Sequence, residues 1–415
     1  MTRTHHPGIA GINLADMDFF ADGTPHEAFA QLRKEAPVSW HQVDAYAGHW
    51  ALVKHEDVVR VSRDPKTFTS EKGIIVETNP DDPPESHSTI LSKMMIYVDP
   101  PRHERLRALV NREFTPRAIA GMQGYVEGVV AELLDEVEEQ REFDFVSAVA
   151  ARLPMYVICR LIGTPDEDRP MLSQLFDRSF GSDDPDFQEG EMTPEETRLK
   201  VLEELIEYLR SNLLRQKRAL ADGDIGTMLA GAEIDGDSLS DDEIIAFYFL
   251  LLGAGSETTR TAAAAGLNAL LERPEQWEML KADRSLAAPA VEEILRWVSP
   301  ILGFGRVATV DTEIRGQEIK AGEKVHMWFA SANRDEEVFE DSQEFKITRS
   351  PNPHLAFGNG THFCLGSSLS RLELRVLFEA LADRLPEIQS AGDLEPLRTL
   401  LTPGIKRMPV RLGRE

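Results

Sequence analysis

The stretch from His354 to Gly366, HLAFGNGTHFCLG, places a single thiol in a glycine-rich loop. Cys364 is one of two cysteines in 415 residues, and the other, Cys159, lies in the apolar run MYVICRLIG. Two cysteines in such different contexts do not form a disulfide framework, so we expect a reducing, cytoplasmic compartment. The isolated thiol therefore needs a chemical explanation of its own.

Three kinds of chemistry fit a lone thiol in this loop. A zinc site needs three or four ligands, and only His354 and His362 accompany Cys364. A cysteine hydrolase is possible, because a helix start lowers the pKa of a thiol. Glycines on both sides of the cysteine remove side chains, as a flat partner lying against the backbone requires. A thiolate ligand to haem iron accounts for the cysteine, the glycines and the helix start together.

A long helix is predicted upstream of this loop. Ser240 and Glu243 form a capping-box pattern, nine apolar residues follow, and Pro274 supplies a stop, giving roughly 32 residues or about 48 Å. Its middle, GAGSETT, places two glycines and polar groups inside an apolar helix. One interpretation is a kink in which Thr258 bonds back to the preceding turn. The other is an opened groove in which Glu257 and Thr258 relay protons.

The rest of the chain predicts a mainly α fold with small β-sheets, as one domain spanning residues 1–415. Residues 103–300 read mainly as helix, residues 305–333 as a small hairpin sheet, and residues 404–412 as a closing strand. Glu293 and Arg296 share one helical face in EEILRW, either as a surface pair or as a buried structural pair.

Composition excludes several classes of function. The formal net charge of −26 opposes binding to nucleic acid and to anionic membranes. No apolar run approaches the roughly 18 to 20 residues that span a bilayer, so no membrane segment is expected. We therefore expect a folded protein that binds neither nucleic acid nor membranes.

Three motifs together resemble the cytochrome P-450 superfamily of haem-thiolate monooxygenases. Residues 357–366, FGNGTHFCLG, resemble the family's F-x-x-G-x-x-x-C-x-G signature, and residues 254–258, AGSET, resemble its A-G-x-(D/E)-T motif. The pair in EEILRW resembles its E-x-x-R motif. The motifs occur in the family's order over nearly the whole chain, so the resemblance implies the single-domain fold of that family with its long central helix over the haem.

The resemblance implies a role for each matching residue around haem b. Cys364 is expected to bind the iron, Glu257 and Thr258 to deliver protons, and Glu293, Arg296 and Arg349 to form a structural triad. The residues expected to contact the haem or its propionates are His103, Arg107, Ala254, Arg306, Phe357, Gly358, His362 and Gly366. The residues expected to contact substrate are Met95, Ile96, Phe247, Leu250, Leu251, Ile301, Leu302, Phe304 and Leu401.

The expected reaction is oxygen-dependent hydroxylation of an unactivated C–H bond in a hydrophobic small molecule, such as a terpenoid, steroid, alkyl or aromatic compound. The chain has no dinucleotide fingerprint, flavin domain or iron–sulfur cysteines, so electrons are expected from a separate ferredoxin and its NAD(P)H-dependent reductase. That partner is expected to dock on a proximal face carrying Arg102, Arg105 and Arg112. The alternatives are a peroxide-driven haem-thiolate oxygenase and a non-catalytic haem ligand carrier or sensor.

Overall fold

The computed structural model describes residues 8–44, 46–78, 90–188, 190–219 and 223–413. The α-helices are α1 (His26–Glu35), α2 (His55–Ser62), α3 (Arg102–Val110), α4 (Pro116–Ala120), α5 (Gln123–Glu138), α6 (Arg152–Ile162), α7 (Arg169–Phe180), α8 (Pro194–Tyr208), α9 (Arg215–Ala219), α10 (Ile225–Ala230), α11 (Asp241–Leu271), α12 (Pro274–Ala282), α13 (Ala287–Val298), α14 (Phe329–Ala332) and α15 (Ser367–Arg384). The strands are β1 (Val38–Val43), β2 (Tyr46–Leu52), β3 (Phe68–Thr69), β4 (Glu142–Asp144), β5 (Glu233–Ile234), β6 (Asp237–Ser238), β7 (Gly303–Ala308), β8 (Thr312–Ile314), β9 (Gln317–Ile319), β10 (Lys324–Trp328), β11 (Ile388–Ser390), β12 (Glu395–Pro396), β13 (Ile405–Arg407) and β14 (Pro409–Leu412).

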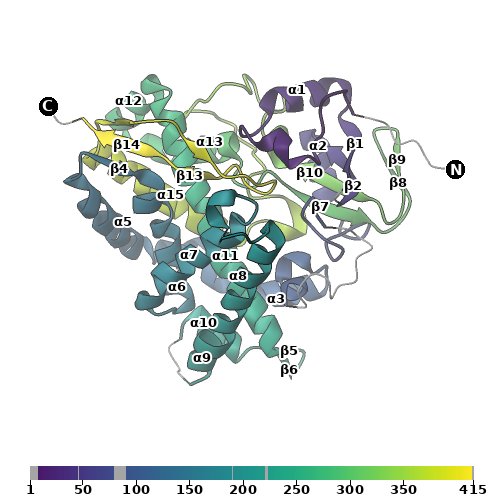
Figure 1. Ribbon diagram of the computed structural model, residues 1–415, viewed down its shortest axis with the longest axis horizontal. Helices are drawn as coiled ribbons and strands as arrows, with labels where there is room; N and C mark the ends of the chain where they lie inside the picture. Colours follow the sequence, from purple (N-terminus) through teal and green to yellow (C-terminus); the bar gives the residue numbers. More distant parts are fainter. Residues whose placement is uncertain (1–7, 45, 79–89, 189, 220–222, 414–415) are drawn as a thin grey trace.

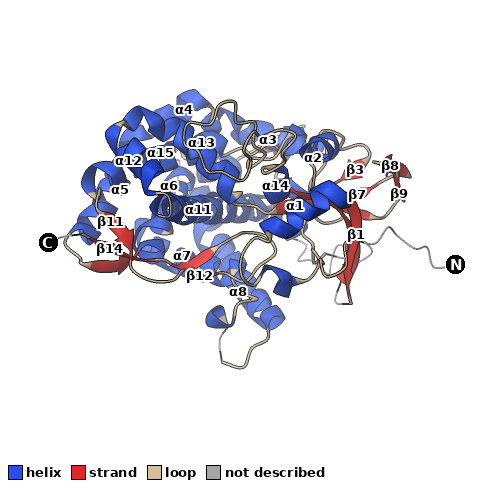
Figure 2. Ribbon diagram, turned by 90° about the horizontal axis from the view of Figure 1, so that it is seen from above, coloured by secondary structure: helices blue, strands red, loops and turns tan. Residues whose placement is uncertain are grey.

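A five-stranded sheet and a larger helical part lie side by side (Figure 1). The sheet has the order β1-β2-β10-β7-β3, with β10 parallel to β2 and antiparallel to β7. The N-terminal helices α1 and α2 accompany it at one end of the molecule, while α11 runs through the helical part (Figure 2). The mainly α fold with small sheets is therefore confirmed, as are the hairpin β8–β9 and the closing strands.

The central helix α11 begins where the sequence predicts. Ser240 caps it in a reciprocal capping box with Glu243, and the helix continues without a break to Leu271. A Cβ atom added at Gly253 would lie 3.0 Å from the Phe176 ring, and one added at Gly255 would lie 3.0 Å from Ile158. The two glycines thus let α11 pack closely against α7 and α6.

Thr258 makes the backbone contact that one interpretation of GAGSETT predicts. Its Oγ1 donates to the carbonyl of Ala254 at 2.9 Å. The helix is nevertheless continuous through this turn. In the described part of the chain, no helix is both long and apolar enough to cross a membrane.

Candidate active site

The cysteine loop is held by its own backbone and by the N-terminal part of the chain. The N–H of Cys364 donates to the carbonyl of Phe357 at 2.9 Å. Gly358 and Gly360 adopt φ values of 68° and 69°, which favour glycine. A Cβ atom at Gly360 would lie 2.2 Å from the carbonyl oxygen of Ser62, the last residue of α2. Gly360 is thus required for a close backbone approach to α2.

The thiol of Cys364 sits in an environment that a cysteine hydrolase would not use. Burial raises its pKa, while a hydrogen bond from the N–H of Gly366 and the charges of Arg107 and Arg371 act in the opposite direction. Helix α15 begins at Ser367, three residues beyond the cysteine, so the helix does not start at the thiol. The net effect is a raised pKa, whereas a cysteine nucleophile needs a lowered one. A metal deprotonates a thiol that coordinates it, so the raised pKa is compatible with a metal ligand.

Neither nearby imidazole completes a zinc site or activates the thiol. Nε2 of His354 lies 3.0 Å from a carboxylate oxygen of Glu292, and Nε2 of His362 lies 3.2 Å from the hydroxyl of Ser70. Burial and the neighbouring cations lower the pKa of His362 to about 2, so its ring is neutral. Both rings are thus engaged by other parts of the protein, which argues against the zinc and hydrolase interpretations.

Glu293 and Arg296 form a fully buried ion pair, not a surface pair. Two parallel hydrogen bonds of 2.7 and 2.8 Å join the guanidinium of Arg296 to the carboxylate, and Nε of Arg349 donates to the same carboxylate at 3.0 Å. Nδ2 of Asn352 also donates to it at 3.1 Å. Because Asn352 lies just upstream of the cysteine loop, the cluster fixes the segment that leads into this loop.

Four bases converge beside the loop from three segments of the chain. The rings of His103 and His362 lie 4.4 Å apart, and Arg107 donates to the carbonyl of Phe363 at 2.7 Å. Burial, reinforced by repulsion among these bases, lowers the pKa of His103 to about 4. Burial also lowers the pKa of Arg306 to about 10, with the charge of Asp99 acting against it.

This cluster fits the two carboxylates of a haem. The guanidinium of Arg306 is buried and donates to the carbonyl of its neighbour, Gly305. Nδ1 of His103 is buried and has no hydrogen-bond partner among the described residues. A bound anion stabilises a buried guanidinium and supplies a partner for a buried ring nitrogen that lacks one. Arg107, Arg306 and the two histidines are thus suited to hold the propionates.

Helix α11 has an uncovered stripe in its otherwise buried middle. Ala254 is exposed, and Leu250 and Thr258, one turn before and after it, are half-buried. The neighbouring Thr259 is buried and its hydroxyl lies 3.1 Å from the hydroxyl of Ser370 in α15. Helix α11 thus contacts the helix that follows the thiol through Thr259, beside the stripe and not through it.

Glu257 points away from this stripe into a buried charge cluster. Nη1 of Arg260 lies 3.3 Å from its carboxylate and also donates to Asp177 on α7. The side chain of Glu257 is 5% exposed. Burial raises the pKa of Glu257, and Asp177 raises it further, while Arg260 acts in the opposite direction. A small cavity adjoins the cluster and is also lined by Ser173 and Ser256.

The expected substrate residues fall into different apolar clusters. Met95, Phe247 and Leu251 are buried in the main cluster, and Ile96 and Leu250 are half-buried against it. Ile301 and Phe304 pack against a second cluster on the sheet, and Leu302 belongs to a third. Leu401 is half-buried, and its carbonyl accepts from the N–H of Leu302 at 2.9 Å. The half-buried members retain surface for a ligand.

The three arginines expected to receive a redox partner each pair with a carboxylate. Arg102 pairs with Glu243, Arg105 with Asp235 and Arg112 with its neighbour Glu113. Their side chains are nevertheless 48%, 49% and 80% exposed. The docking patch therefore stays a prediction.

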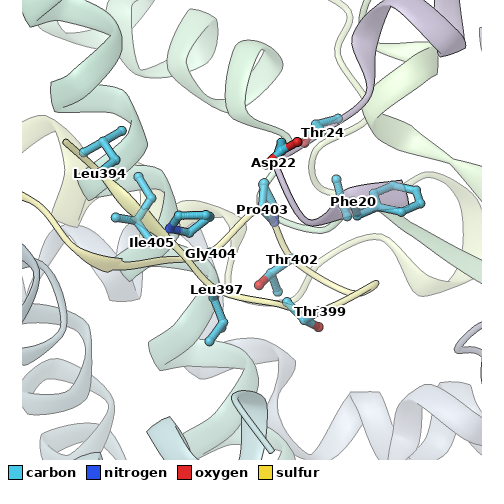
Figure 3. Close-up of a pocket in the computed structure, with 13 residues that line it drawn as sticks. Phe20, Asp22, Thr24, Leu394, Leu397, Thr399, Thr402, Pro403, Gly404 and Ile405 are labelled. Carbon is cyan, nitrogen blue, oxygen red and sulfur yellow. The ribbon is translucent and has the colours of Figure 1, made fainter. Parts of the chain in front are cut away.

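Sequence reasoning missed Asp177 and Arg260, the partners of Glu257. Arg260 carries a signal, since it follows Glu257 by three residues and shares its helical face. Asp177 carries none, because its contact depends on how α7 packs across α11. A pocket lined by Phe20 and by the segment from Leu394 to Ile405 was also missed, because its walls meet only through tertiary packing (Figure 3).

Comparisons with known proteins agree with this geometry. The cytochrome P450 family model matches residues 19–385. A steroid C26-monooxygenase of Rhodococcus jostii is 38% identical, over 96% of this chain and 84% of the relative. A methyl-branched lipid omega-hydroxylase of Mycobacterium tuberculosis is 39% identical, over 97% and 95% of the two chains. The chain belongs to the cytochrome P450 family and is a haem-dependent monooxygenase.

Solved structures show the same likeness. A Mycobacterium marinum cytochrome P450, CYP268A2, in complex with pseudoionone superposes with a TM-score of 0.91 at 34% identity, covering 99% of this chain and all of that one. CYP109E1 of Bacillus megaterium in complex with testosterone gives 0.85 at 31% identity, covering 96% of this chain and all of that one. The fold of this chain is therefore the fold of those cytochrome P450 enzymes over nearly its whole length.

Proposed function

We propose that this monooxygenase uses haem b, molecular oxygen and two electrons to hydroxylate an unactivated C–H bond of a hydrophobic small molecule. One oxygen atom enters the C–H bond, and the other leaves as water after taking up two protons and two electrons. When bound, the haem with its Cys364 thiolate supplies the oxidising chemistry. The chain's own residues must then hold the cofactor, shape the apolar site and deliver protons.

The observation that carries the proposal is the arrangement of acid and hydroxyl around one turn of α11. Thr258 lies on the uncovered stripe, and Glu257 is buried behind it with a raised pKa. A carboxyl whose pKa is raised holds its proton more readily than an exposed one and can pass that proton on during turnover. Arg260 and Asp177 hold this carboxyl away from the stripe, so proton delivery requires its rotation toward Thr258. A carrier protein has no need of this arrangement.

The substrate is a hydrophobic molecule in this proposal. The residues expected to face it are apolar, and none of them can bind a carboxylate. The relatives are named for action on a steroid and on a methyl-branched lipid, and the similar solved structures hold pseudoionone and testosterone. These neighbours support a lipid-like substrate of comparable polarity.

A separate ferredoxin is the proposed electron donor, with a docking surface that includes the cysteine loop. Phe363, next to the thiol, is 41% exposed. Arg63 bonds the loop at Asn359, and Arg371 and Arg112 are also partly exposed. An acidic partner would meet an apolar centre with a basic rim. Reduction rates that respond neither to ionic strength nor to Arg112→Glu would contradict this surface.

The Thr258→Ala variant tests the oxygenase proposal. Removing the hydroxyl should uncouple electron consumption from product formation, so that NAD(P)H is consumed while peroxide replaces the hydroxylated product. Thr259→Ala is a matched control, because that hydroxyl is buried against Ser370 and lies off the stripe. Equal coupling in both variants would contradict the assignment. A peroxide-driven enzyme would be indifferent to Thr258→Ala when supplied with peroxide.

A further inference from the structure

The carboxylate of Glu292, in α13, holds the chain on both sides of the cysteine loop. Nε and Nη2 of Arg371 donate to its two oxygens at 2.7 and 2.9 Å. Nε2 of His354 lies 3.0 Å from one of these oxygens. His354 precedes Cys364 in the chain and Arg371 follows it in α15, so one acid clamps both arms of the loop. This clamp has other partners than the cluster around the neighbouring Glu293.

Arg371 supplies the positive charge of the clamp. The N–H of Ala356 donates to Nδ1 of His354 at 3.2 Å, so this ring carries its proton at Nε2 and donates to Glu292 as a neutral group. Burial alone would raise the pKa of Glu292, but the hydrogen bonds from His354 and Arg371 lower it to about 2. The carboxylate is therefore ionised, and its charged partner is Arg371.

The guanidinium of Arg371 lies against the loop that carries the thiol. Its central carbon is 4.4 Å from the centre of the Phe357 ring, and the carbonyl of Phe357 accepts from the N–H of Cys364. The quadrupole of an aromatic ring holds a cation over its face. The charge of Arg371 favours the thiolate form of Cys364, as does the charge of Arg107. The guanidinium thus contacts the loop with its face and the carboxylate of α13 with one edge.

The ion pair is only partly open to water. The side chains of Arg371 and Glu292 are 38% and 31% exposed. A charge shielded in this way acts more strongly on a neighbour than a fully exposed charge, because water and salt screen it less. Arg375, one turn further along α15, pairs with Glu379, and these side chains are 31% and 33% exposed. The two arginines thus differ in their contact with the loop and hardly in their exposure.

We propose that Arg371, oriented by Glu292, raises the reduction potential of the haem iron through the Cys364 thiolate. One electron from the redox partner converts ferric iron to ferrous iron, and no bond is made or broken. The reduced centre carries one more negative charge, so a cation beside the sulfur stabilises it and a carboxylate destabilises it. Arg371 acts through the sulfur and is a positioning residue. The inference rests on the proposed haem-thiolate function and goes beyond it, because neither proton delivery nor propionate binding uses this pair.

The test measures the reduction potential of the substrate-free holoenzyme by spectroelectrochemical titration without a ferredoxin. Omitting the partner separates the potential from docking, to which Arg371 also contributes in the proposed function. Arg371→Met should lower the equilibrium constant for reduction about tenfold, which is about 59 mV. Glu292→Gln should raise this constant about threefold, because the amide oxygen still accepts from Arg371 while the opposing charge is gone. Arg371→Lys keeps the charge and should stay within about twofold of the wild type.

Two control variants separate the effect of charge from the effect of structure. Arg375→Met removes the same charge one turn further along the helix and should change the constant by less than about twofold. His354→Leu removes one bond of the clamp and no charge, so it should leave the potential unchanged.

Opposite shifts for Arg371→Met and Glu292→Gln would support the inference. Shifts of the same sign, or a shift for His354→Leu or Arg375→Met as large as that for Arg371→Met, would overturn it. The reduced, CO-bound spectrum of each variant shows whether the sulfur still binds the iron. A red-shifted Soret band that persists while the potentials do not move overturns this inference alone. Absence of that band from the wild type contradicts the proposed haem-thiolate function itself, and the inference with it.

Discussion

Replacing Arg296 with methionine should destabilise the protein more than any exposed arginine replacement. The side chain is fully buried. Besides its bonds to Glu293, it donates hydrogen bonds to the carbonyls of Asn333 and Ser342 at 2.9 Å each. Removing one partner of a buried ion pair costs roughly 3–5 kcal/mol. For a chain of 415 residues the entropy of unfolding is about 0.9 kcal/mol per kelvin, so Tm should fall by about 3–6 °C.

Arg349→Met and Arg112→Met provide the comparison. Arg349 also contacts Glu293, but its other bonds go to exposed carbonyls that water can reach, so we expect a loss of about 1 kcal/mol. Arg112 is 80% exposed and should change stability by less than about 0.5 kcal/mol. Differential scanning calorimetry of the holoenzymes measures all three. Equal shifts for Arg296→Met and Arg349→Met would refute the burial argument.

Three further predictions concern charge and ligation. Asp177→Asn should lower the pKa of Glu257, because it removes a repelling charge, and should move the acid limb of product formation per NAD(P)H consumed to lower pH. His49 and His326 are buried with pKa values well below 6.5, so the unfolded chain alone takes up their protons. Stability should therefore fall as pH decreases below about 6.5, by up to 1.36 kcal/mol per pH unit for each histidine, and His326→Leu should flatten a plot of Tm against pH. Cys364→Ser should abolish the strongly red-shifted Soret band of the reduced, CO-bound protein, and retention of that band would disprove thiolate ligation.

The sequence predicted those features whose causes are local. The cap of α11 depends on Ser240 and Glu243, three residues apart, so a short pattern revealed it. The loop glycines were expected to make room for a flat partner, whereas Gly360 makes room for the end of α2. The buried state of Glu293 and Arg296 was one of two alternatives, because a helical spacing does not show which face a helix buries. The partners of Arg102 and Arg105 depend on where α3 meets the start of α11 and the turn between β5 and β6, and no local pattern encodes those contacts.

The unforeseen ion pairs of Arg102 and Arg105 and the missed pocket share one physical origin. Both depend on segments that lie far apart in sequence and meet only through tertiary packing. Phe20 and Thr402 approach each other because the N-terminal turn and the β12–β13 region pack at one place. Composition could show that these segments are apolar, but it could not show that they share a cavity.

The contact between Gly360 and Ser62 has a practical consequence for protein engineering. Because the loop that carries Cys364 rests on the end of α2, the metal ligand is supported jointly by the N-terminal and the helical parts of the molecule. Chimaeras that exchange the first 60 to 70 residues in order to change substrate preference would also disturb the position of the sulfur. The reduction potentials of such chimaeras should be measured before any altered product pattern is attributed to the residues that contact substrate.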